Sequence, residues 1–181
     1  MKLTQNSASN MNPLTNLKRI YFIGIGGIGM SALARYFNTQ GVLVSGYDKT
    51  PTALTDSLVE EGISIHFEDD LNQIDKDATV IVYTPAIPAE HKELNYYKDN
   101  GYLVVKRSDV LQWVTENAFT IGIAGTHGKT TTTSMTAHIL RHTVYGCNAF
   151  LGGIASNYDT NFWSHEKNVV VVEADEYDRS F

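Results

Sequence analysis

The chain contains 181 residues, 43% of them hydrophobic and 19% charged, which suits one globular domain or one domain plus part of another. Its formal net charge of −6 excludes a general attraction to nucleic acid or to an anionic membrane. A single cysteine, Cys147, excludes an internal disulfide and favours a reducing compartment. Residues 1–17 are polar and lack an apolar signal segment, and no run is long enough to span a bilayer. We therefore expect a flexible arm at 1–17 on a cytoplasmic protein.

Short apolar runs rich in β-branched residues alternate with helical patterns along the rest of the chain. Strands are predicted at Ile20–Ile23, Val42–Ser45, Ile63–Phe67, Thr79–Tyr83, Leu103–Val105, Thr120–Ala124 and Val169–Val172. Helices are predicted at Met30–Asn38, Ala53–Glu60, Glu93–Asp99, Val110–Thr115 and Thr130–Arg141. Continuous apolar strands alternating with helices are typical of parallel sheets covered on both faces, so the pattern predicts an α/β fold.

Two glycine loops divide the chain into two series of elements. One loop opens at Gly24 and the other at Gly125. We expect a Rossmann-like parallel sheet domain at 18–107 and a linker at 108–118, with Ser108 as a helix N-cap. Residues 119–181 would then form the first part of a P-loop-type α/β ATP-binding domain.

The first loop has the G-x-G-x-x-G pattern between a strand and a helix, formed by Gly24, Gly26 and Gly29. In such a loop the glycines permit a tight turn, close approach of a diphosphate, and packing of the helix on the strand. The helix N-terminus offers unpaired N–H groups to phosphates. Asp48 follows at the end of the second strand, where an acid can accept hydrogen bonds from ribose hydroxyls. The pattern fits either NAD or a UDP-sugar, and the alternative is a turn that binds no ligand.

The second loop also leads from an apolar strand into a helix, and it ends in Gly128-Lys129-Thr130. Backbone N–H groups here can cradle the phosphates of a nucleoside triphosphate, while Lys129 neutralises their oxygens and the Thr130 hydroxyl ligates Mg²⁺. The loop is a short G-x-x-G-K-T form, because Ile123 occupies the position where the longer P-loop pattern has its first glycine. The alternative is a solvated lysine beside glycines that serve only a turn.

Acidic residues follow the last predicted strand. Glu173 comes directly after the apolar run, with Asp175 and Glu176 close behind. A carboxylate at such a strand end can hold Mg²⁺, so we predict Thr130 and Glu173 as metal ligands. His138 and His142 lie four residues apart on one predicted helix, but without a further ligand they indicate an ordinary helix surface.

A diphosphate-binding first domain followed by a short ATP loop resembles the Mur ligase family. The segments that carry the resemblance are Gly24–Ser31, Val44–Asp48, Ala124–Thr133, Ala149–Gly153 and Glu173–Glu176. Thr84 stands where the family usually has a serine-rich turn, which is a small departure. Together the loops and the resemblance assign ligand-binding roles to Gly26, Gly27, Ile28, Gly29, Met30, Ser31, Asp48 and Thr84 for the UDP-sugar, and to Gly125, Thr126, His127, Gly128, Lys129, Thr130 and Thr131 for ATP.

The resemblance implies an ATP- and Mg²⁺-dependent ligase of peptidoglycan synthesis, with Lys129 and His127 as catalytic residues. Its partners would be UDP-N-acetylmuramate and L-alanine, joined through an acyl phosphate with release of ADP and phosphate. Family members have three domains, so the resemblance implies that the amino-acid domain lies beyond Phe181 and that these 181 residues would not catalyse alone.

Three other functions stay open at this point. A recycling ligase that attaches an intact peptide to the same sugar nucleotide would use the same residues in this region. An NAD-dependent oxidoreductase would use the Gly24 loop but leaves the Gly125 loop unexplained. A non-catalytic UDP-sugar-binding module is the third reading.

Overall fold

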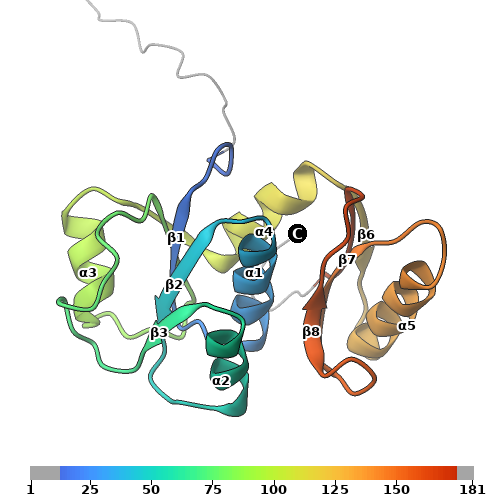
Figure 1. Ribbon diagram of the computed structural model, residues 1–181, viewed down its shortest axis with the longest axis horizontal. Helices are drawn as coiled ribbons and strands as arrows, with labels where there is room; N and C mark the ends of the chain where they lie inside the picture. The colour runs from blue at the N-terminus through green and yellow to red at the C-terminus, as the bar shows by residue number, and fades with distance from the viewer. Residues whose placement is uncertain (1–12, 175–181) are drawn as a thin grey trace, which may run out of the picture.

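A computed structural model describes residues 13–174 of the chain, and their order of strands and helices confirms the predicted α/β fold (Figure 1). The elements are β1 (Arg19–Ile23), α1 (Ile28–Thr39), β2 (Leu43–Tyr47), α2 (Ala53–Glu60), β3 (Ser64–His66), β4 (Val80–Tyr83), α3 (Lys92–Asp99), β5 (Leu103–Lys106), α4 (Arg107–Glu116), β6 (Phe119–Ile123), α5 (Lys129–Arg141), β7 (Asn148–Ala155), β8 (Thr160–Trp163) and β9 (Val169–Glu173). Part of the predicted arm, residues 1–12, and the acids Asp175 and Glu176 lie outside the described residues.

The first sheet has the strand order β3-β2-β1-β4-β5, and every neighbouring pair is parallel. The order reverses at β1, between β2 and β4. In open α/β sheets ligands bind at the carboxyl ends of the strands beside such a reversal. The glycine loop that follows β1 therefore stands at the expected binding position.

The second sheet has the order β6-β9-β7-β8 and includes a hairpin that the sequence analysis did not predict. Strands β6, β9 and β7 are parallel, whereas β8 runs antiparallel to β7. The apolar run of β7 is interrupted by Gly152 and Gly153, and β8 is only four residues long. Neither segment therefore carries the continuous apolar signal by which the parallel strands were recognised.

The helices and the two sheets form successive layers (Figure 1). One face of the first sheet packs on α3, through a cluster that includes Tyr21, Ile81 and Tyr97. Its other face shares a single hydrophobic core with α1, α4 and the near face of the second sheet. The far face of the second sheet packs on α5. Because α1 and α4 are buried between the sheets, the two sheets are joined by a continuous core rather than by a loose connection.

A buried polar cluster joins the two sheets within this core. Arg35 of α1, which is only 4% exposed, donates to the side-chain oxygen of Asn161 on β8 and to the Glu61 carboxylate, the latter at 2.8 Å. Asn161 in turn donates to the Ile28 carbonyl at 2.6 Å and to the Ser31 hydroxyl at 2.9 Å. Buried polar groups are costly unless they are hydrogen-bonded, and these five groups satisfy one another.

The predicted linker is largely a packed helix, α4, which begins one residue before Ser108. The expectation that Ser108 caps this helix is wrong. Instead, the Asp109 carboxylate accepts a hydrogen bond from the Lys106 N–H at 2.9 Å at the helix start. Val110, Leu111 and Val114 are buried in the shared core.

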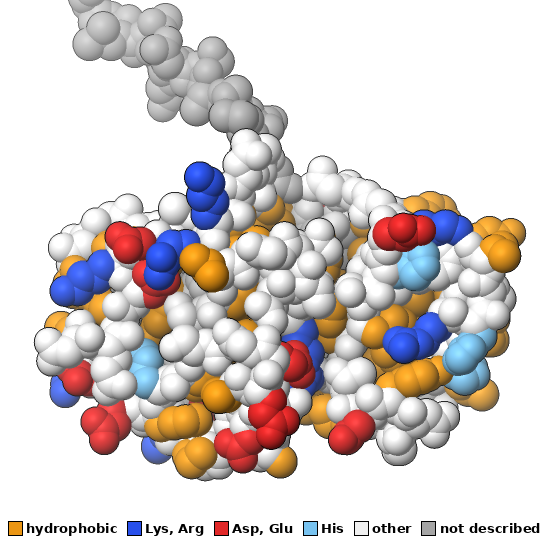
Figure 2. Space-filling view, viewed as in Figure 1, with side chains coloured by type: hydrophobic (Ala, Val, Ile, Leu, Met, Phe, Trp, Pro, Cys, Tyr) orange, Lys and Arg blue, Asp and Glu red, His pale blue; other side chains and the backbone are white. Residues whose placement is uncertain are grey.

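The surface shows no continuous basic region on the face in Figure 2, where acidic and basic side chains are mixed. Hydrophobic side chains are exposed around α5, among them Met135 and Ile139. No helix among residues 13–174 is long and apolar enough to cross a bilayer.

Candidate functional site: two glycine loops at the strand ends

The first glycine loop is anchored to the end of β2. The N–H groups of Gly24 and Ile25 both donate to the Tyr47 carbonyl, at 2.8 and 3.0 Å. Gly24 has a φ of +88°, a left-handed conformation that side chains other than glycine rarely adopt. The turn leads directly into α1, whose first residues carry N–H groups without partners from within the helix.

Asp48 holds the loop from the side. Its Oδ2 accepts a hydrogen bond from the Gly26 N–H at 2.7 Å, and its Oδ1 accepts one from the Thr50 N–H at 3.1 Å. A Cβ on Gly26 would lie 2.8 Å from Asp48 Oδ2, so glycine is needed here for the approach of the carboxylate. The structure thus gives Asp48 a loop-positioning contact that the sequence analysis did not foresee, and its predicted contact with a ribose stays a prediction.

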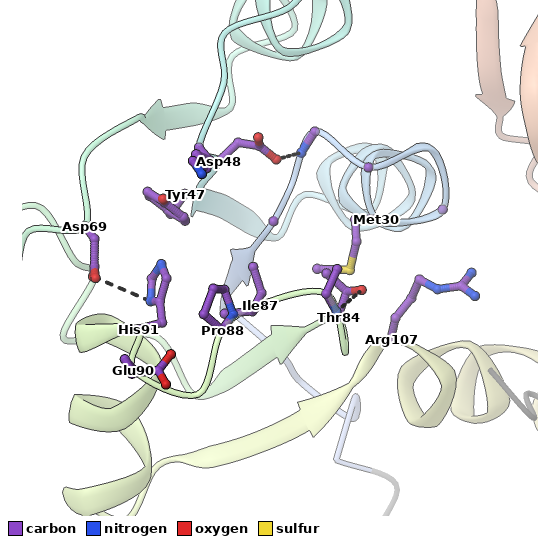
Figure 3. Close-up of a pocket in the computed structure, with 16 residues that line it drawn as sticks. Met30, Tyr47, Asp48, Asp69, Thr84, Ile87, Pro88, Glu90, His91 and Arg107 are labelled. Carbon is purple, nitrogen blue, oxygen red and sulfur yellow. Dashed lines mark hydrogen bonds and ion pairs between the residues drawn. The ribbon is translucent and has the colours of Figure 1, made fainter. Parts of the chain in front are cut away.

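A cavity of about 750 Å³ opens over this loop at the carboxyl ends of the strands (Figure 3). Six of the eight predicted UDP-sugar residues line it: Gly26, Gly27, Gly29, Met30, Asp48 and Thr84. The other lining residues are Gly24, Tyr47, Lys49, Asp69, Ala86, Ile87, Pro88, Glu90, His91 and Arg107. Figure 3 shows Met30 and Arg107 on one side of the cavity and Asp69 and His91 on the other.

Ile28 and Ser31 do not line this cavity. The Ser31 side chain is buried, donates to the Ile28 carbonyl at 2.9 Å and accepts from Asn161. Its hydroxyl is thereby committed to the contact between the two sheets. Ile28 instead lines a smaller cavity between α1 and β7.

Tyr47 supplies an aromatic wall to the cavity. Burial raises the pKa of its phenol, and the nearby carboxylates of Asp69, Glu93 and Asp48 raise it further. The phenol is therefore held in its neutral form, in which it can donate a hydrogen bond.

The second loop begins helix α5 from a left-handed glycine. Gly128, the residue before the helix, has a φ of +76°, and Gly125 has a φ of +145°. The Lys129 ammonium group donates to the Gly125 carbonyl at 2.8 Å, so the side chain folds back over its own loop. This is the position from which a lysine can reach phosphate oxygens held by the loop. His127 is exposed on the same loop.

The two predicted metal ligands lie together. The Thr130 hydroxyl donates to Glu173 Oε2 at 3.2 Å, and Glu173 Oε1 accepts from the Gly152 N–H at 2.8 Å. A Cβ on Gly152 would lie only 2.6 Å from Glu173 Oε2, so this glycine leaves room for the carboxylate. A hydroxyl and a carboxylate beside a phosphate-binding loop form an oxygen donor set that fits Mg²⁺, which commonly uses one or two carboxylates plus substrate phosphates.

His138 and His142 do not form a metal site of the usual kind. Both rings contact the Tyr158 hydroxyl, at 2.5 and 2.9 Å. Within residues 13–174, no group of three or more His, Cys, Asp or Glu side chains is arranged to hold a metal ion.

A smaller cavity of about 210 Å³ lies between the first loop and Glu173. Gly29 and Arg107 line both this cavity and the larger one, and Gly152 and Glu173 line only the smaller one.

The sequence analysis did not predict Arg107 as a cavity residue. Its position directly after β5, at the carboxyl edge of the sheet, was the available signal. Arg107 also lies over Gly29, where a Cβ would come within 2.5 Å of the guanidinium group.

Comparison with known proteins identifies the family. Residues 19–118 match the Mur ligase family, catalytic domain. The chain belongs to this family, as the sequence analysis indicated.

Two curated relatives with similar sequences share the same name. The UDP-N-acetylmuramate–L-alanine ligase of Porphyromonas gingivalis is 56% identical over 171 residues, which cover 91% of this chain and 38% of that protein. The protein of the same name from Flavobacterium johnsoniae is 52% identical over 172 residues. The chain thus spans about 38% of the length of the curated relatives that it matches.

Solved structures confirm the fold. The crystal structure of UDP-N-acetylmuramate-alanine ligase from Thermotoga maritima matches with a TM-score of 0.79 and 32% identity, covering 89% of this chain and 37% of that one. The ligase from Neisseria meningitides that is named for an L-alanyl-γ-D-glutamyl-meso-diaminopimelate substrate matches with a TM-score of 0.81 and 29% identity, over 90% of this chain and 54% of that one.

Proposed function

We propose that the chain forms the nucleotide-binding part of a ligase that joins L-alanine to UDP-N-acetylmuramate in peptidoglycan synthesis, at the expense of ATP. The observation that carries the proposal is the route from the first loop to Glu173, the predicted metal ligand beside Thr130. The cavity over the first loop shares Gly29 and Arg107 with a smaller cavity that reaches Glu173, and Glu173 accepts a hydrogen bond from Thr130, the second residue of the helix that follows the second loop. An acid bound at the first site would thereby meet a phosphoryl donor bound at the second.

The first cavity would hold the UDP-sugar. Backbone N–H groups at the start of α1 would receive the diphosphate, in a loop whose shape Asp48 maintains through Gly26. The sugar carries a carboxylate, which must extend toward Glu173 if it is to accept a phosphoryl group. Arg107 lies along that route and brings a positive charge to it.

The second loop would hold ATP. Loop N–H groups and Lys129 would stabilise the charge on the phosphates, and Thr130 and Glu173 would hold Mg²⁺. When bound, Mg²⁺ would supply positive charge to the transferred phosphoryl group. The sugar-acid carboxylate would become an acyl phosphate, and attack by the amino group of L-alanine would form the amide and release phosphate. His127, which is exposed on this loop, would orient either anion, and we retain it as a candidate catalytic residue.

The similarity to curated relatives favours L-alanine over an intact peptide as the second substrate, because the relatives at 52–56% identity carry the alanine-ligase name. We place the enzyme in the cytoplasm, because both ATP and UDP-linked sugars are available there.

A calorimetric titration tests the proposal. We expect the chain to bind UDP-N-acetylmuramate saturably and to give no binding heat with NADH. Lys129→Ala is the matched control, because it alters the second loop and should leave UDP-sugar binding unchanged. Tight binding of NADH without binding of the UDP-sugar would contradict the ligase function and favour an oxidoreductase.

A further inference from the structure

Two histidines and a tyrosine converge beside the last turns of α5, outside both glycine loops. His138 and His142 lie four residues apart on one face of the helix, with their ring centroids 4.6 Å apart. Tyr158 lies in the turn between β7 and β8, which runs beside α5 (Figure 1). Its hydroxyl oxygen is 2.5 Å from His138 Nδ1 and 2.9 Å from His142 Nε2. Three side-chain atoms that can each offer a lone pair therefore meet at one place.

The chemistry of these three atoms suits a transition-metal ion. Imidazole nitrogens are typical ligands of Zn²⁺, Cu²⁺ and Ni²⁺, and tyrosine binds metals through its deprotonated oxygen. The cluster lies outside the usual groups of His, Cys and acidic side chains because its third member is a tyrosine. Its two nitrogens also distinguish it from the oxygen donors of Thr130 and Glu173, which fit Mg²⁺.

The geometry of the cluster is close to that of a metal site. In a tetrahedral zinc site, bonds of about 2.0–2.1 Å place the ligand atoms roughly 3.3 Å apart. The two nitrogen–oxygen distances here are 2.5 and 2.9 Å, so the atoms would separate by only about 0.4–0.8 Å to admit an ion. Both histidines are exposed, so their rings can turn by this amount without disturbing the core.

Tyr158 is held in place by its neighbours. Its ring packs on Trp163, with centroids 4.8 Å apart, and its N–H donates to the Ala155 carbonyl at 2.9 Å. The Arg141 guanidinium lies over the same ring, 4.7 Å from the centroid. This positive charge would stabilise the phenolate that serves as a metal ligand. The third ligand is therefore positioned before any ion binds.

One side of the cluster is open. A cavity of about 500 Å³ lies between α5 and the β7–β8 turn, and both His138 and Tyr158 line it. Three protein ligands leave the fourth position of a tetrahedral ion to water, and the cavity provides room for that water.

We propose that His138, His142 and Tyr158 bind a divalent transition-metal ion with the preferences of Zn²⁺. Both imidazoles would bind in their neutral form, the phenol would release its proton to solvent, and water would complete the coordination. Because the histidines belong to α5 and the tyrosine to the hairpin turn, the ion would clamp the helix of the second loop to the β7–β8 hairpin.

Zinc titration of the chelator-treated chain tests this inference. Zn²⁺ would be added in competition with a colorimetric zinc chelator, with excess Mg²⁺ present to occupy the oxygen site at the second loop. Ultraviolet difference absorbance would report the formation of tyrosinate, and thermal unfolding would be followed with and without Zn²⁺. The variants are His138→Ala, His142→Ala and Tyr158→Phe. His165→Ala is the matched control, because it removes an exposed histidine outside the cluster.

We expect the wild-type chain and His165→Ala to bind Zn²⁺ with equal affinity, with a tyrosinate signal at neutral pH and a higher unfolding temperature. Each of the two other histidine variants should bind about 100-fold more weakly or less, and gain no thermal stability from Zn²⁺. Tyr158→Phe should bind about 10-fold more weakly and give no tyrosinate signal.

The inference is wrong if Tyr158→Phe binds Zn²⁺ as tightly as the wild type, or if His165→Ala weakens binding as much as His142→Ala does. It is also wrong if the wild-type chain gives no saturable binding. None of these results bears on the proposed function, because the three ligands contribute to neither glycine loop.

Discussion

Thr130 and Glu173 are 43 residues apart in the chain, yet the hydroxyl of one donates to the carboxylate of the other at 3.2 Å. The parallel pairing of β6 with β9 causes this proximity, because it aligns Ile123 with Glu173 and so brings the strand end next to the second loop. Thr130 follows that loop as the second residue of α5. The sheet topology therefore assembles the proposed magnesium site from two distant segments.

A single methyl group should disrupt this site. In Gly152→Ala the added Cβ would lie 2.6 Å from Glu173 Oε2 and displace the carboxylate. We expect Mg²⁺-dependent binding of ATP to weaken about 10-fold or more, measured with a fluorescent ATP analogue in the presence and absence of Mg²⁺. Gly153→Ala is the matched control, since its Cβ would meet only Thr130 Cγ2 at 3.6 Å. Equal affinities in the two variants would show that Glu173 does not hold the ion.

Removal of the Asp48 carboxylate should loosen the first loop. In Asp48→Ala the Gly26 N–H loses its acceptor at 2.7 Å, and hydrogen bonds to charged groups contribute about 1.5–3 kcal/mol. We expect binding of UDP-N-acetylmuramate to weaken about 10- to 100-fold by calorimetry. Asp56→Ala, on the outer part of α2, serves as a control of equal charge. Unchanged affinity in Asp48→Ala would mean that the loop keeps its shape without this contact.

The contact between the two sheets should contribute strongly to stability. Asn161→Ala would leave the Arg35 guanidinium, the Ser31 hydroxyl and the Ile28 carbonyl without a common partner. We expect the free energy of unfolding to fall by about 2 kcal/mol or more in urea denaturation. Asn157→Ala, at an exposed position between the two strands of the same hairpin, should change it by less than about 0.5 kcal/mol. If both substitutions lowered the free energy of unfolding by similar amounts, the contact of Asn161 between the sheets would not contribute specially to stability.

Alkaline unfolding should depend on Tyr21. Burial raises the pKa of this phenol well above its ordinary value of 10.0, and Glu93, which accepts its hydrogen bond at 2.6 Å, raises it further. A group whose pKa is raised in the folded state contributes stability below its unfolded pKa, and this contribution is lost as the pH rises above about 10. We therefore expect the part of the tyrosinate absorbance that comes from Tyr21, which is missing in Tyr21→Phe, to develop together with the loss of helical circular dichroism.

Tyr21→Phe provides the comparison. The variant should be less stable than the wild type at neutral pH, by about 1–3 kcal/mol, because Glu93 loses a buried donor. It should nevertheless lose less stability between neutral pH and pH values above about 10. A wild-type chain in which Tyr21 ionises without unfolding would contradict the assignment of this buried hydrogen bond.

Regular local patterns made much of this molecule predictable. Strands β1, β4 and β9 could be predicted from their apolar runs, because burial on both faces of the sheet restricts the choice of residue. The turns at Gly24 and Gly128 could be predicted because a positive φ favours glycine. The short β7–β8 hairpin was missed, because paired glycines and a four-residue strand give no such signal.

Long-range polar contacts were not predictable for a different reason. Arg35 and Asn161 are 126 residues apart, and nothing in either neighbourhood indicates the other. His91 and Arg107 were missed as cavity residues because each stands alone at an element boundary, outside any motif. Both residues line the cavity because they follow β4 and β5 at the carboxyl edge of the sheet, and the order of the strands in the sheet decides which loops lie beside the cavity.

The most direct test of the account is to map ligand-induced amide chemical-shift changes by nuclear magnetic resonance. UDP-N-acetylmuramate and ATP with Mg²⁺ would be added separately to the isotopically labelled chain. We predict that the UDP-sugar shifts the amides of Gly26, Gly27 and Thr84, whereas ATP with Mg²⁺ shifts those of Gly128 and Lys129. Shifts at the first loop with NADH but not with the UDP-sugar would contradict the account.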